Sequence, residues 1–301
     1  MLWILVIYKK HRLHNSLNLL RIKRKGYLVC PNGFRLYFGK RNYRDIKRLF
    51  EFSVIYGVNF SKNNEGWHYE DNVLTLPNGI RFYVNRFDPL IFAETFLNDV
   101  HFSDFDLNHK IVIQAGGFIG DTALYYAQRG AKVFSFEPDI NSFNQAIENI
   151  KLNPQISDNI VMKNWALGRD GEIEFPIIPD GSGGSSSYAT KGRRTVKVNS
   201  VSVQSILKGF NIEHPYLLDL DIKGNEFDVV KDQSLSKFEL IRIEYSANIE
   251  NVRIGNRNDL VEKLKYYGFK NIRIFKHNDG NFDLSVHGTI EAKKTATLTS
   301  G

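Results

Sequence analysis

The stretch that decides the fold is residues 110–139, which read KIVIQAGGFIGDTALYYAQRGAKVFSFEPD. A short apolar run over 111–113 predicts a buried parallel strand, and a second run over 132–136 predicts another. Between them lie a turn crowded with glycine and a helical pattern that ends at Gly130. The order strand, glycine turn, helix, strand is typical of an open α/β sheet.

The turn and the tip of the second strand predict a nucleoside-type cofactor. Glycine lets backbone amides approach a ligand closely and lets the chain turn sharply, and the turn holds Gly116, Gly117 and Gly120. Glu137 stands at the carboxyl end of the second strand, where such a sheet places an acid against the two ribose hydroxyls of a nucleoside. These residues predict the class of cofactor but not which cofactor.

The composition is that of an ordinary globular protein, with 42% hydrophobic and 24% charged residues in 301. A chain of this length holds one large domain, or one domain with an extension. Its single cysteine, Cys30, excludes an internal disulfide and a cysteine-based zinc cluster. This cysteine usage fits a reducing compartment, so we expect a cytoplasmic location.

The positive charge belongs to the N-terminus. The net charge is +7, but residues 1–50 hold 13 Lys and Arg against one acid, Asp45, and the rest holds 27 bases against 32 acids. The apolar start, MLWILVIY, is too short for a bilayer, which takes about 20 apolar residues. Its charges follow the apolar run, the reverse of a secretory signal, so we expect neither a membrane span nor a signal there.

Three interpretations of residues 1–25 stay open. The favoured one is an N-terminal helix packed on the domain with its bases in solvent, because charge runs are usually solvated faces. The second is a basic amphipathic segment in peripheral contact with an anionic membrane, where each base near the surface contributes about 1 kcal/mol. The third is RNA binding, although no recognisable RNA-binding motif accompanies these charges.

The N-terminal third contains an internal repeat. Residues 28–37, LVCPNGFRLY, resemble residues 74–83, LTLPNGIRFY, and each segment predicts a β-hairpin around a Pro-Asn-Gly turn. A helix-like run follows each hairpin, over 45–56 and over 89–100. We expect residues 1–100 to form a basic extension of two hairpin-plus-helix units that cap the sheet or shape the substrate pocket. Chance similarity of common turn chemistry is the alternative.

The pattern of strands continues beyond Glu137. A third parallel strand is predicted over 159–165, and Trp165 at its end stacks on the base of a bound nucleoside or fills core. Further strands are predicted over 172–177 and 195–201. The glycine- and serine-rich run over 180–188 is a substrate lid if it lies near the strand tips, and otherwise a surface loop.

Residues 217–226, LLDLDIKGNE, are the second chemical focus. The leucines predict a buried strand, Asp219 and Asp221 fall at its carboxyl end, and Gly224 opens a helix. Two acids beside a cofactor turn are candidates for a general base, a metal pair, or a clamp on the cofactor's amino group. We expect their side chains to point to opposite faces of the strand, so that only one reaches a given ligand.

The C-terminal part predicts an antiparallel finish to the sheet. A strand over 240–245 contains Glu244, and a helix over 259–267 ends at a glycine. Residues 269–276 and 282–290 then look like an antiparallel pair. A dinucleotide dehydrogenase differs here, because its sixth strand stays parallel.

This order of motifs resembles the FkbM-type family of S-adenosylmethionine-dependent methyltransferases over about residues 74–292. In this order and spacing the motifs are specific for the superfamily and for the family. The resemblance rests on Gly116–Thr122 (GGFIGDT), Phe136–Pro138 (FEP), Ala166–Gly168 (ALG), Asp221–Glu226 (DIKGNE), Ile243–Tyr245 (IEY) and Gly288–Ile290 (GTI).

The resemblance implies a class I methyltransferase fold: an α/β, Rossmann-like, mostly parallel seven-stranded sheet with an antiparallel C-terminal hairpin. It places a domain that binds S-adenosylmethionine over 101–292, after the α+β extension, and leaves a disordered tail over 293–301. It implies O-methylation of a hydroxyl on a sugar, glycolipid or small metabolite. The cofactor-binding residues that it implies are Gln114, Gly116, Gly117, Phe118, Gly120, Asp121, Thr122, Glu137, Pro138, Trp165, Ala166 and Asp219.

Two departures from the family pattern bear on activity. The family usually has an acid where Gln114 stands, and it usually reads Lys-x-Asp-x-Glu-Gly where this chain has Asp219-Leu-Asp-Ile-Lys223-Gly. The charge pair is kept in reversed order, or Asp219 supplies the negative charge missing at Gln114. Otherwise the site is weakened, and the chain is a non-catalytic cofactor-binding scaffold. An RNA methyltransferase is a further alternative, suggested by residues 1–50.

The resemblance also directs the search for a catalytic base. An alkyl hydroxyl is too weak an acid to ionise unaided, so a nearby carboxylate should take its proton. Asp221 is the first candidate, with Glu226, Glu244 and His287 in reserve. Helix capping and a strand-end ion pair are the structural alternatives for the two glutamates, and for His287 a structural role is favoured. We predict no metal site, although Asp221 and Glu244 are the carboxylates that a divalent cation would use.

Overall fold

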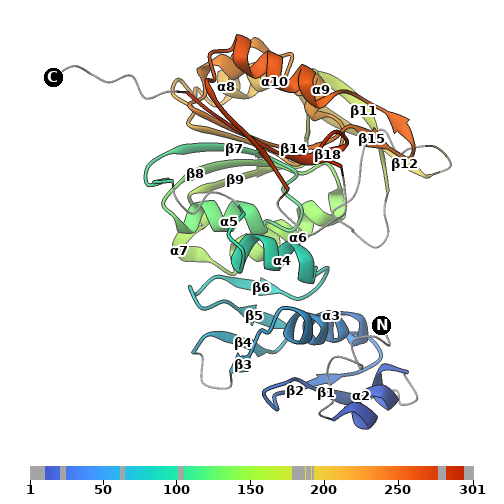
Figure 1. Cartoon of the computed structure of the whole chain (residues 1–301). Coiled ribbons are helices and arrows are strands. Elements are labelled where there is room, and N and C mark those ends of the chain that lie inside the picture. Colours follow the sequence, from blue (N-terminus) through green and yellow to red (C-terminus); the bar gives the residue numbers. More distant parts are fainter. Residues whose placement is uncertain are drawn as a thin grey trace. The chain divides into compact units, whose positions relative to one another are not determined.

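The computed structural model describes residues 11–20, 25–61, 65–100, 105–177, 187, 191, 193–276 and 283–294. The chain divides into two compact units, one of residues 1–101 with 151–153 and one of residues 102–150 with 154–301. Figure 1 traces the chain from blue to red. Among the described residues, no helix combines the length and the hydropathy needed to cross a membrane.

The first unit contains two small sheets and short helices. A two-stranded sheet pairs β1 (Gly26–Val29) with β2 (Arg35–Phe38), and a four-stranded sheet runs in the order β3 (Phe60–Ser61), β4 (Trp67–Glu70), β5 (Val73–Thr75) and β6 (Arg81–Tyr83). The helices are α2 (Arg12–Leu19), α3 (Tyr43–Ile55) and α4 (Pro89–Phe96). Aromatic rings fill the core: the ring of Phe87 lies 5.3 Å from that of Phe52 and 4.4 Å from that of Phe92.

Both predicted hairpins are present, and their turns are built alike. Gly33 and Gly79 have φ of 87° and 86°, the left-handed region that glycine adopts at little cost. The amide of each glycine donates to the carbonyl three residues back, on Cys30 and Leu76, at 2.9 Å. The repeated Pro-Asn-Gly therefore specifies one turn twice, and a helix follows each hairpin. The second hairpin also extends into a larger sheet, because β4 pairs along β5.

An N-terminal helix packs on the first hairpin, as the favoured interpretation expects for part of residues 1–25. Asn15 of α2 accepts from the amide of Val29 at 2.9 Å and donates to its carbonyl at 3.0 Å. Residues 1–10 and 21–24 lie outside the described residues.

The second unit is organised around the predicted seven-stranded sheet, which confirms the fold class. The strand order is β17-β18-β14-β13-β7-β8-β9. The five strands from β14 to β9 are parallel, and β18 and β17 run antiparallel to them. The strands are β7 (Ile111–Ala115), β8 (Lys132–Phe136), β9 (Ile160–Lys163), β13 (Leu217–Leu220), β14 (Leu240–Ser246), β17 (Asn271–Phe275) and β18 (His287–Lys293).

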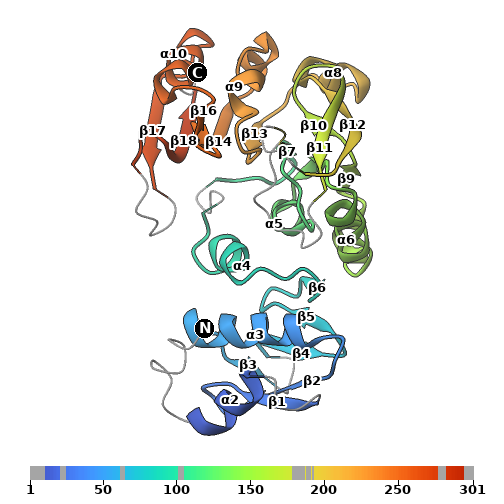
Figure 2. The same cartoon turned by 90° about the vertical axis from the view of Figure 1, so that its right-hand side faces the viewer.

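Helices cover both faces of this sheet (Figures 1 and 2). On one face lie α5 (Asp121–Gln128), α6 (Ile140–Lys151) and α7 (Pro154–Ser157), and on the other lie α8 (Val203–Gly209), α9 (Glu226–Val229) and α10 (Arg257–Tyr266). An apolar cluster of the unit joins strand residues such as Leu218 and Ile241 to Ile206 of α8 and Leu264 of α10. Parallel strands covered on both faces read as continuous apolar runs, which is why the sequence reveals them.

A second, smaller sheet follows the third parallel strand. β12 (Thr195–Val201) lies between β10 (Ala166–Leu167) and β11 (Gly171–Pro176). The strands predicted over 172–177 and 195–201 therefore form, whereas β10 was not expected. A short hairpin of β15 (Asn248–Ile249) and β16 (Val252–Arg253) and the 3-10 helix η1 (Gln233–Lys237) complete the unit.

Candidate functional site

The glycine turn after β7 lies against the segment that follows β13. Gly116 has φ of 89°, and a β-carbon there would lie 2.1 Å from the backbone oxygen of Asp221. A β-carbon at Gly117 would lie 2.6 Å from the methyl carbon of Met162. No side chain fits at either position without moving its neighbours, so the close approach of these segments requires glycine.

Helix α5 begins directly after the turn. Gly120 has φ of 84° and stands at the helix N-cap. Asp121 and Thr122, predicted to bind the cofactor, are both buried in the first turn, where the Thr122 hydroxyl donates to the Asp121 carboxylate at 3.3 Å. The two residues thus lie where the turn passes into the helix.

Glu137 braces the turn from the tip of β8. Its two carboxylate oxygens accept from the amide of Phe118 at 2.8 Å and from the amide of Asp139 at 2.7 Å. Burial of the side chain raises the pKa of Glu137 to about 8, against the opposite effect of these two bonds. The acid predicted at this strand tip is therefore in contact with the glycine turn.

Asn164 holds the loop after Glu137, a role that sequence analysis did not assign. Its amide donates to the carbonyls of Glu137 and Pro138 at 2.8 and 3.0 Å. The half-buried ring of Trp165 stacks 6.1 Å from that of Phe136. One side of Trp165 thus belongs to the core, and Ala166 next to it is buried in β10.

A row of polar side chains crosses the sheet beneath the turn. Ser135, Gln114, Asp219 and Arg242 occupy directly opposed positions on β8, β7, β13 and β14, and directly opposed side chains share one face. Gln114 donates to the carbonyl of Gly116 at 2.8 Å and accepts from the Ser135 hydroxyl. A carboxylate cannot donate to that carbonyl, so the departure from the family pattern at Gln114 has a local reason.

Asp219 lies within this row. One of its carboxylate oxygens pairs with the Arg242 guanidinium at 2.9 Å, and the other accepts from the Tyr126 hydroxyl at 2.7 Å. Asp219 is 2% exposed. Its negative charge is balanced by Arg242, and the pair lies in the interior of the sheet.

The reason for expecting Asp219 and Asp221 to point to opposite faces does not hold, and Asp221 lies just beyond β13, which ends at Leu220. Residues two apart in a strand lie on the same face. The two acids differ in depth instead, because the side chain of Asp221 is 39% exposed. Asp221 therefore reaches the carboxyl edge of the sheet, whereas Asp219 stays beneath it.

Asp221 belongs to a cluster of charged side chains at this edge. The Lys223 ammonium lies 3.5 Å from the Asp221 carboxylate and 2.9 Å from that of Glu244. The Nε2 atom of His287 lies 3.9 Å from Glu244, and its Nδ1 lies 3.3 Å from the Ser246 hydroxyl. The structure therefore brings together three of the candidate residues, including His287, for which the sequence favoured a structural role.

Burial shifts the acid–base properties of the cluster. Although the Asp221 side chain is partly exposed, its Oδ1 atom is buried. Loss of water around the carboxylate and the neighbouring Glu244 raise the pKa of Asp221 to about 6, and Lys223 acts in the opposite direction. The nearby Asp221 carboxylate raises the pKa of Lys223 above its ordinary value, so the ammonium stays charged. Burial lowers the pKa of His287, despite the nearby Glu244.

Glu226, the first reserve candidate for the base, is engaged by the backbone. Its carboxylate oxygens accept from the amides of Gly224 and Ser246, both at 2.6 Å. The side chain is fully buried, and burial raises its pKa to about 7. Glu226 thus ties the segment just before α9 to β14, through bonds to amides that lie outside the helix.

The Lys223 ammonium lies within 3.5 Å of both carboxylates that a divalent cation would use, Asp221 and Glu244. The single positive charge of Lys223 already compensates part of the negative charge of these two carboxylates. Within the described part of the chain, no group of three or more His, Cys, Asp or Glu side chains is arranged to hold a metal ion.

Most of the glycine- and serine-rich run predicted as a lid lies outside the described residues. Ser187 is described, and its hydroxyl donates to the Asn225 side chain at 2.9 Å. This bond joins one residue of the run to the segment that connects Asp221 with α9.

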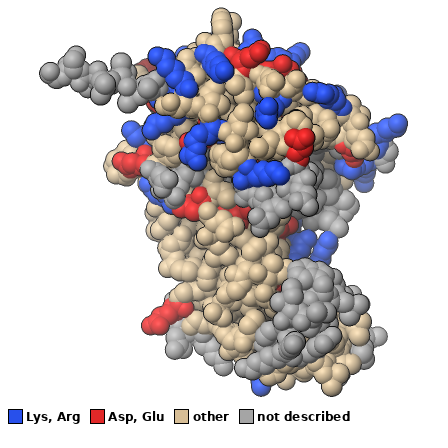
Figure 3. Space-filling view, viewed as in Figure 1, with Lys and Arg blue, Asp and Glu red and all other residues tan. Residues whose placement is uncertain are grey.

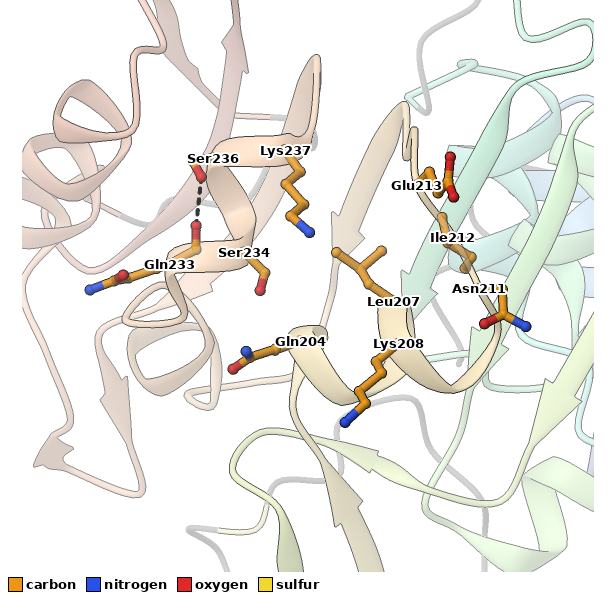
Figure 4. A pocket seen from close by; sticks show the side chains of 10 residues that line it. All are labelled: Gln204, Leu207, Lys208, Asn211, Ile212, Glu213, Gln233, Ser234, Ser236 and Lys237. Carbon is orange, nitrogen blue, oxygen red and sulfur yellow. Dashed lines mark hydrogen bonds between the residues drawn. The ribbon is translucent and has the colours of Figure 1, made fainter.

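A cavity of about 660 Å³ lies between α8 and η1 (Figure 4). Its lining includes Asn211 to Glu213, just before β13, and Ser236 and Lys237, just before β14. Parallel strands begin at one edge of a sheet and end at the other, so this cavity lies at the edge opposite the glycine turn.

Figure 3 shows Lys and Arg mixed with Asp and Glu on the described surface of this unit in that view.

The solved structures that match the chain are distant in sequence. The N-terminal domain of human METTL16 in complex with S-adenosylhomocysteine is 14% identical, with a TM-score of 0.40, and the alignment covers 89% of this chain and 88% of that one. Magnesium protoporphyrin IX methyltransferase from Synechocystis PCC 6803 with bound S-adenosylmethionine is 11% identical, with a TM-score of 0.39, over 67% and 78% of the two chains.

No curated protein matches the sequence. The model of the FkbM methyltransferase domain matches residues 114–271, which is more than half of the chain and runs from β7 into β17. The chain therefore belongs to the FkbM family, and it is an S-adenosylmethionine-dependent methyltransferase.

Proposed function

We propose that the chain is an O-methyltransferase whose acceptor is a hydroxyl on a sugar, glycolipid or small metabolite. The observation that carries the proposal is the position of Asp221. It is a part-exposed carboxylate whose own backbone lies against Gly116 of the cofactor turn. Hydroxyl methylation needs a proton acceptor at such a position.

The residues at the turn fit the cofactor. Gly116 packs directly against the backbone of Asp221, which sets the path of the turn, and Glu137 contacts the turn through the Phe118 amide. We propose that Glu137 holds the ribose hydroxyls and that Trp165 lies beside the purine. When bound, S-adenosylmethionine supplies a methyl group on a positively charged sulfur, which departs by in-line displacement.

Asp221 is the proposed proton acceptor. With its pKa raised to about 6, the carboxylate is ionised at neutral pH and yet binds a proton more strongly than an ordinary aspartate. Lys223, 3.5 Å away, favours the ionised form, and Glu244 holds Lys223 from the other side at 2.9 Å. Lys223 thus pairs with Asp221 and Glu244, whereas Asp219, the other residue of the reversed charge pattern, pairs with Arg242.

Calorimetry and an acceptor screen test the proposal. The full chain is titrated with S-adenosylmethionine and with S-adenosylhomocysteine, and then incubated with a library of sugars, glycolipids and hydroxylated metabolites whose methylation is followed by mass spectrometry. O-methylation of a member of the library supports the proposal. Cofactor binding without any turnover would favour the scaffold hypothesis, and methylation of RNA instead would identify an RNA methyltransferase.

Replacing Gly116 with alanine is expected to weaken binding of S-adenosylhomocysteine at least tenfold. The new β-carbon would lie 2.1 Å from the backbone oxygen of Asp221, and φ of 89° strains any residue other than glycine. Gly209→Ala is the matched control, because nothing lies within 4 Å of a β-carbon there. Equal affinities of the two variants in calorimetry would mean that the turn does not form the cofactor cradle.

The pH dependence of turnover reports on Asp221. We expect turnover to rise as pH increases through about 6, because the carboxylate must be ionised before it accepts a proton. Lys223 lowers the pKa of Asp221, so Lys223→Met should move this rise to higher pH. Lys197→Met, which removes an exposed ammonium 3.4 Å from Glu172, is the control. If Lys223→Met does not shift the pH at which turnover rises, Asp221 is excluded as the titrating base.

A further inference from the structure

Helix α2 is oriented opposite to the usual surface helix. Its buried residues include Asn15, Asn18 and Leu19, which are 0%, 7% and 5% exposed, whereas Leu13, Leu17 and the C-cap residue Leu20 are 76%, 47% and 60% exposed. Surface helices normally bury their apolar stripe and expose their polar one. The three leucines are spaced by four and three residues, so they lie along one side of the helix.

The polar side of α2 faces inward because it satisfies a strand edge. Asn15 pairs with both backbone groups of Val29 at 2.9 and 3.0 Å, and a ring nitrogen of His14 lies 3.0 Å from the carbonyl of Tyr27. These side chains occupy the place of a neighbouring strand along β1, whose other edge pairs with β2. The Tyr43 hydroxyl donates to the carbonyl of Leu19 at 2.7 Å and fixes the helix end. These contacts hold the polar side of α2 against β1, so the three leucines point outward.

We propose that the leucine face of α2, made of Leu13, Leu17 and Leu20, docks on the surface of an anionic lipid bilayer. The sequence on both sides of this face supplies the matching charge. Residues 9–25 contain seven Lys and Arg and no acid. Leucines on one helix side flanked by bases are the pattern of a helix that lies in the membrane interface, and anionic headgroups attract such bases.

Charge alone would fit RNA as well, and the leucines decide between the two. Phosphate contacts use Lys, Arg and polar groups and have no use for exposed aliphatic side chains. A lipid surface uses both features, because the leucines enter the acyl boundary while the bases remain among the headgroups. The observations therefore favour lipid over nucleic acid.

Vesicle co-sedimentation of the full chain tests the inference. We expect binding to vesicles of phosphatidylcholine with phosphatidylserine to be at least tenfold tighter than binding to phosphatidylcholine alone, and to weaken as salt is added. The triple variant Leu13→Gln, Leu17→Gln, Leu20→Gln should lose at least tenfold in affinity for the anionic vesicles. Leu90→Gln, at a position 46% exposed on α4, is the matched control and should bind like the unaltered chain.

Three results would overturn the inference. The first is that the unaltered chain does not bind anionic vesicles. The second is that the triple variant binds them as tightly as Leu90→Gln does. If the triple variant still binds, residues 2–7 are replaced by polar residues. Loss of vesicle binding in that variant would assign the membrane contact to the apolar start of the chain instead. Light scattering that shows a dimer in the unaltered chain and a monomer in the triple variant would mean that a second copy covers the leucines. A far-ultraviolet circular dichroism spectrum and a urea unfolding curve that match those of the unaltered chain show that the triple variant remains folded.

Discussion

Asp221→Asn is expected to lower turnover by a factor of about 10²–10⁴ while leaving the affinity for S-adenosylhomocysteine largely unchanged. The amide keeps the shape of the side chain but cannot accept the proton of the hydroxyl. Asp221 lies at the edge of the site, 3.5 Å from Lys223, and does not belong to the buried row of polar side chains that crosses the sheet. Turnover is measured with an acceptor from the library, and affinity by calorimetry.

Glu172→Gln is the matched control for this experiment, because it makes the same change on an exposed carboxylate of β11, 3.4 Å from Lys197. It should leave turnover unchanged. Near-normal turnover in Asp221→Asn would place the base elsewhere, and Glu244→Gln and His287→Gln would then be compared, since Glu244 and His287 lie 3.9 Å apart in the same cluster.

Arg242→Met is expected to lower the free energy of unfolding by about 3–5 kcal/mol, because it leaves the Asp219 carboxylate buried without its partner charge. The pair is 2.9 Å long, and its side chains are 1% and 2% exposed. Urea unfolding followed by circular dichroism measures the loss. Adding Asp219→Asn should restore part of it, since the asparagine oxygen still accepts from Tyr126 and carries no charge.

An exposed ion pair provides the comparison. Arg169 is 78% exposed and lies 3.3 Å from Asp228, and exposed pairs contribute about 0–1 kcal/mol. Arg169→Met should therefore change the free energy of unfolding by no more than that. Equal losses in Arg169→Met and Arg242→Met would contradict the role of the buried row in holding β13 against β14.

Much of the fold follows from local patterns. The apolar runs of the parallel strands, the glycine turn after β7 and the two Pro-Asn-Gly turns depend on residues that are near neighbours in sequence. These patterns act through steric constraints between near neighbours, so residues such as Gly116 and Gly79 predict the turns in which they lie. The antiparallel pairing of β17 with β18 was predicted for the same reason, from two apolar runs that lie close together in the chain.

The candidate site was only partly predictable. The positions of Gly116, Glu137 and Asp221 follow from their places at strand ends. The contacts of His287 with Glu244 and Ser246 do not, because β18 and β14 are adjacent in the sheet although 41 residues separate Ser246 from His287. The expectation that Asp219 and Asp221 point to opposite faces did not follow from strand geometry, because residues two apart in a strand share a face.

The sequence by itself determined the class I sheet, the cofactor turn and membership of the methyltransferase family, because these depend on strand periodicity and on glycine at fixed spacings. Only the tertiary structure decided what each charge does. It paired Asp219 with Arg242, gave Gln114 both a donor and an acceptor role, and turned the leucines of α2 outward. Strand order brings distant residues within hydrogen-bond distance, and a polar group is buried only where such a partner satisfies it.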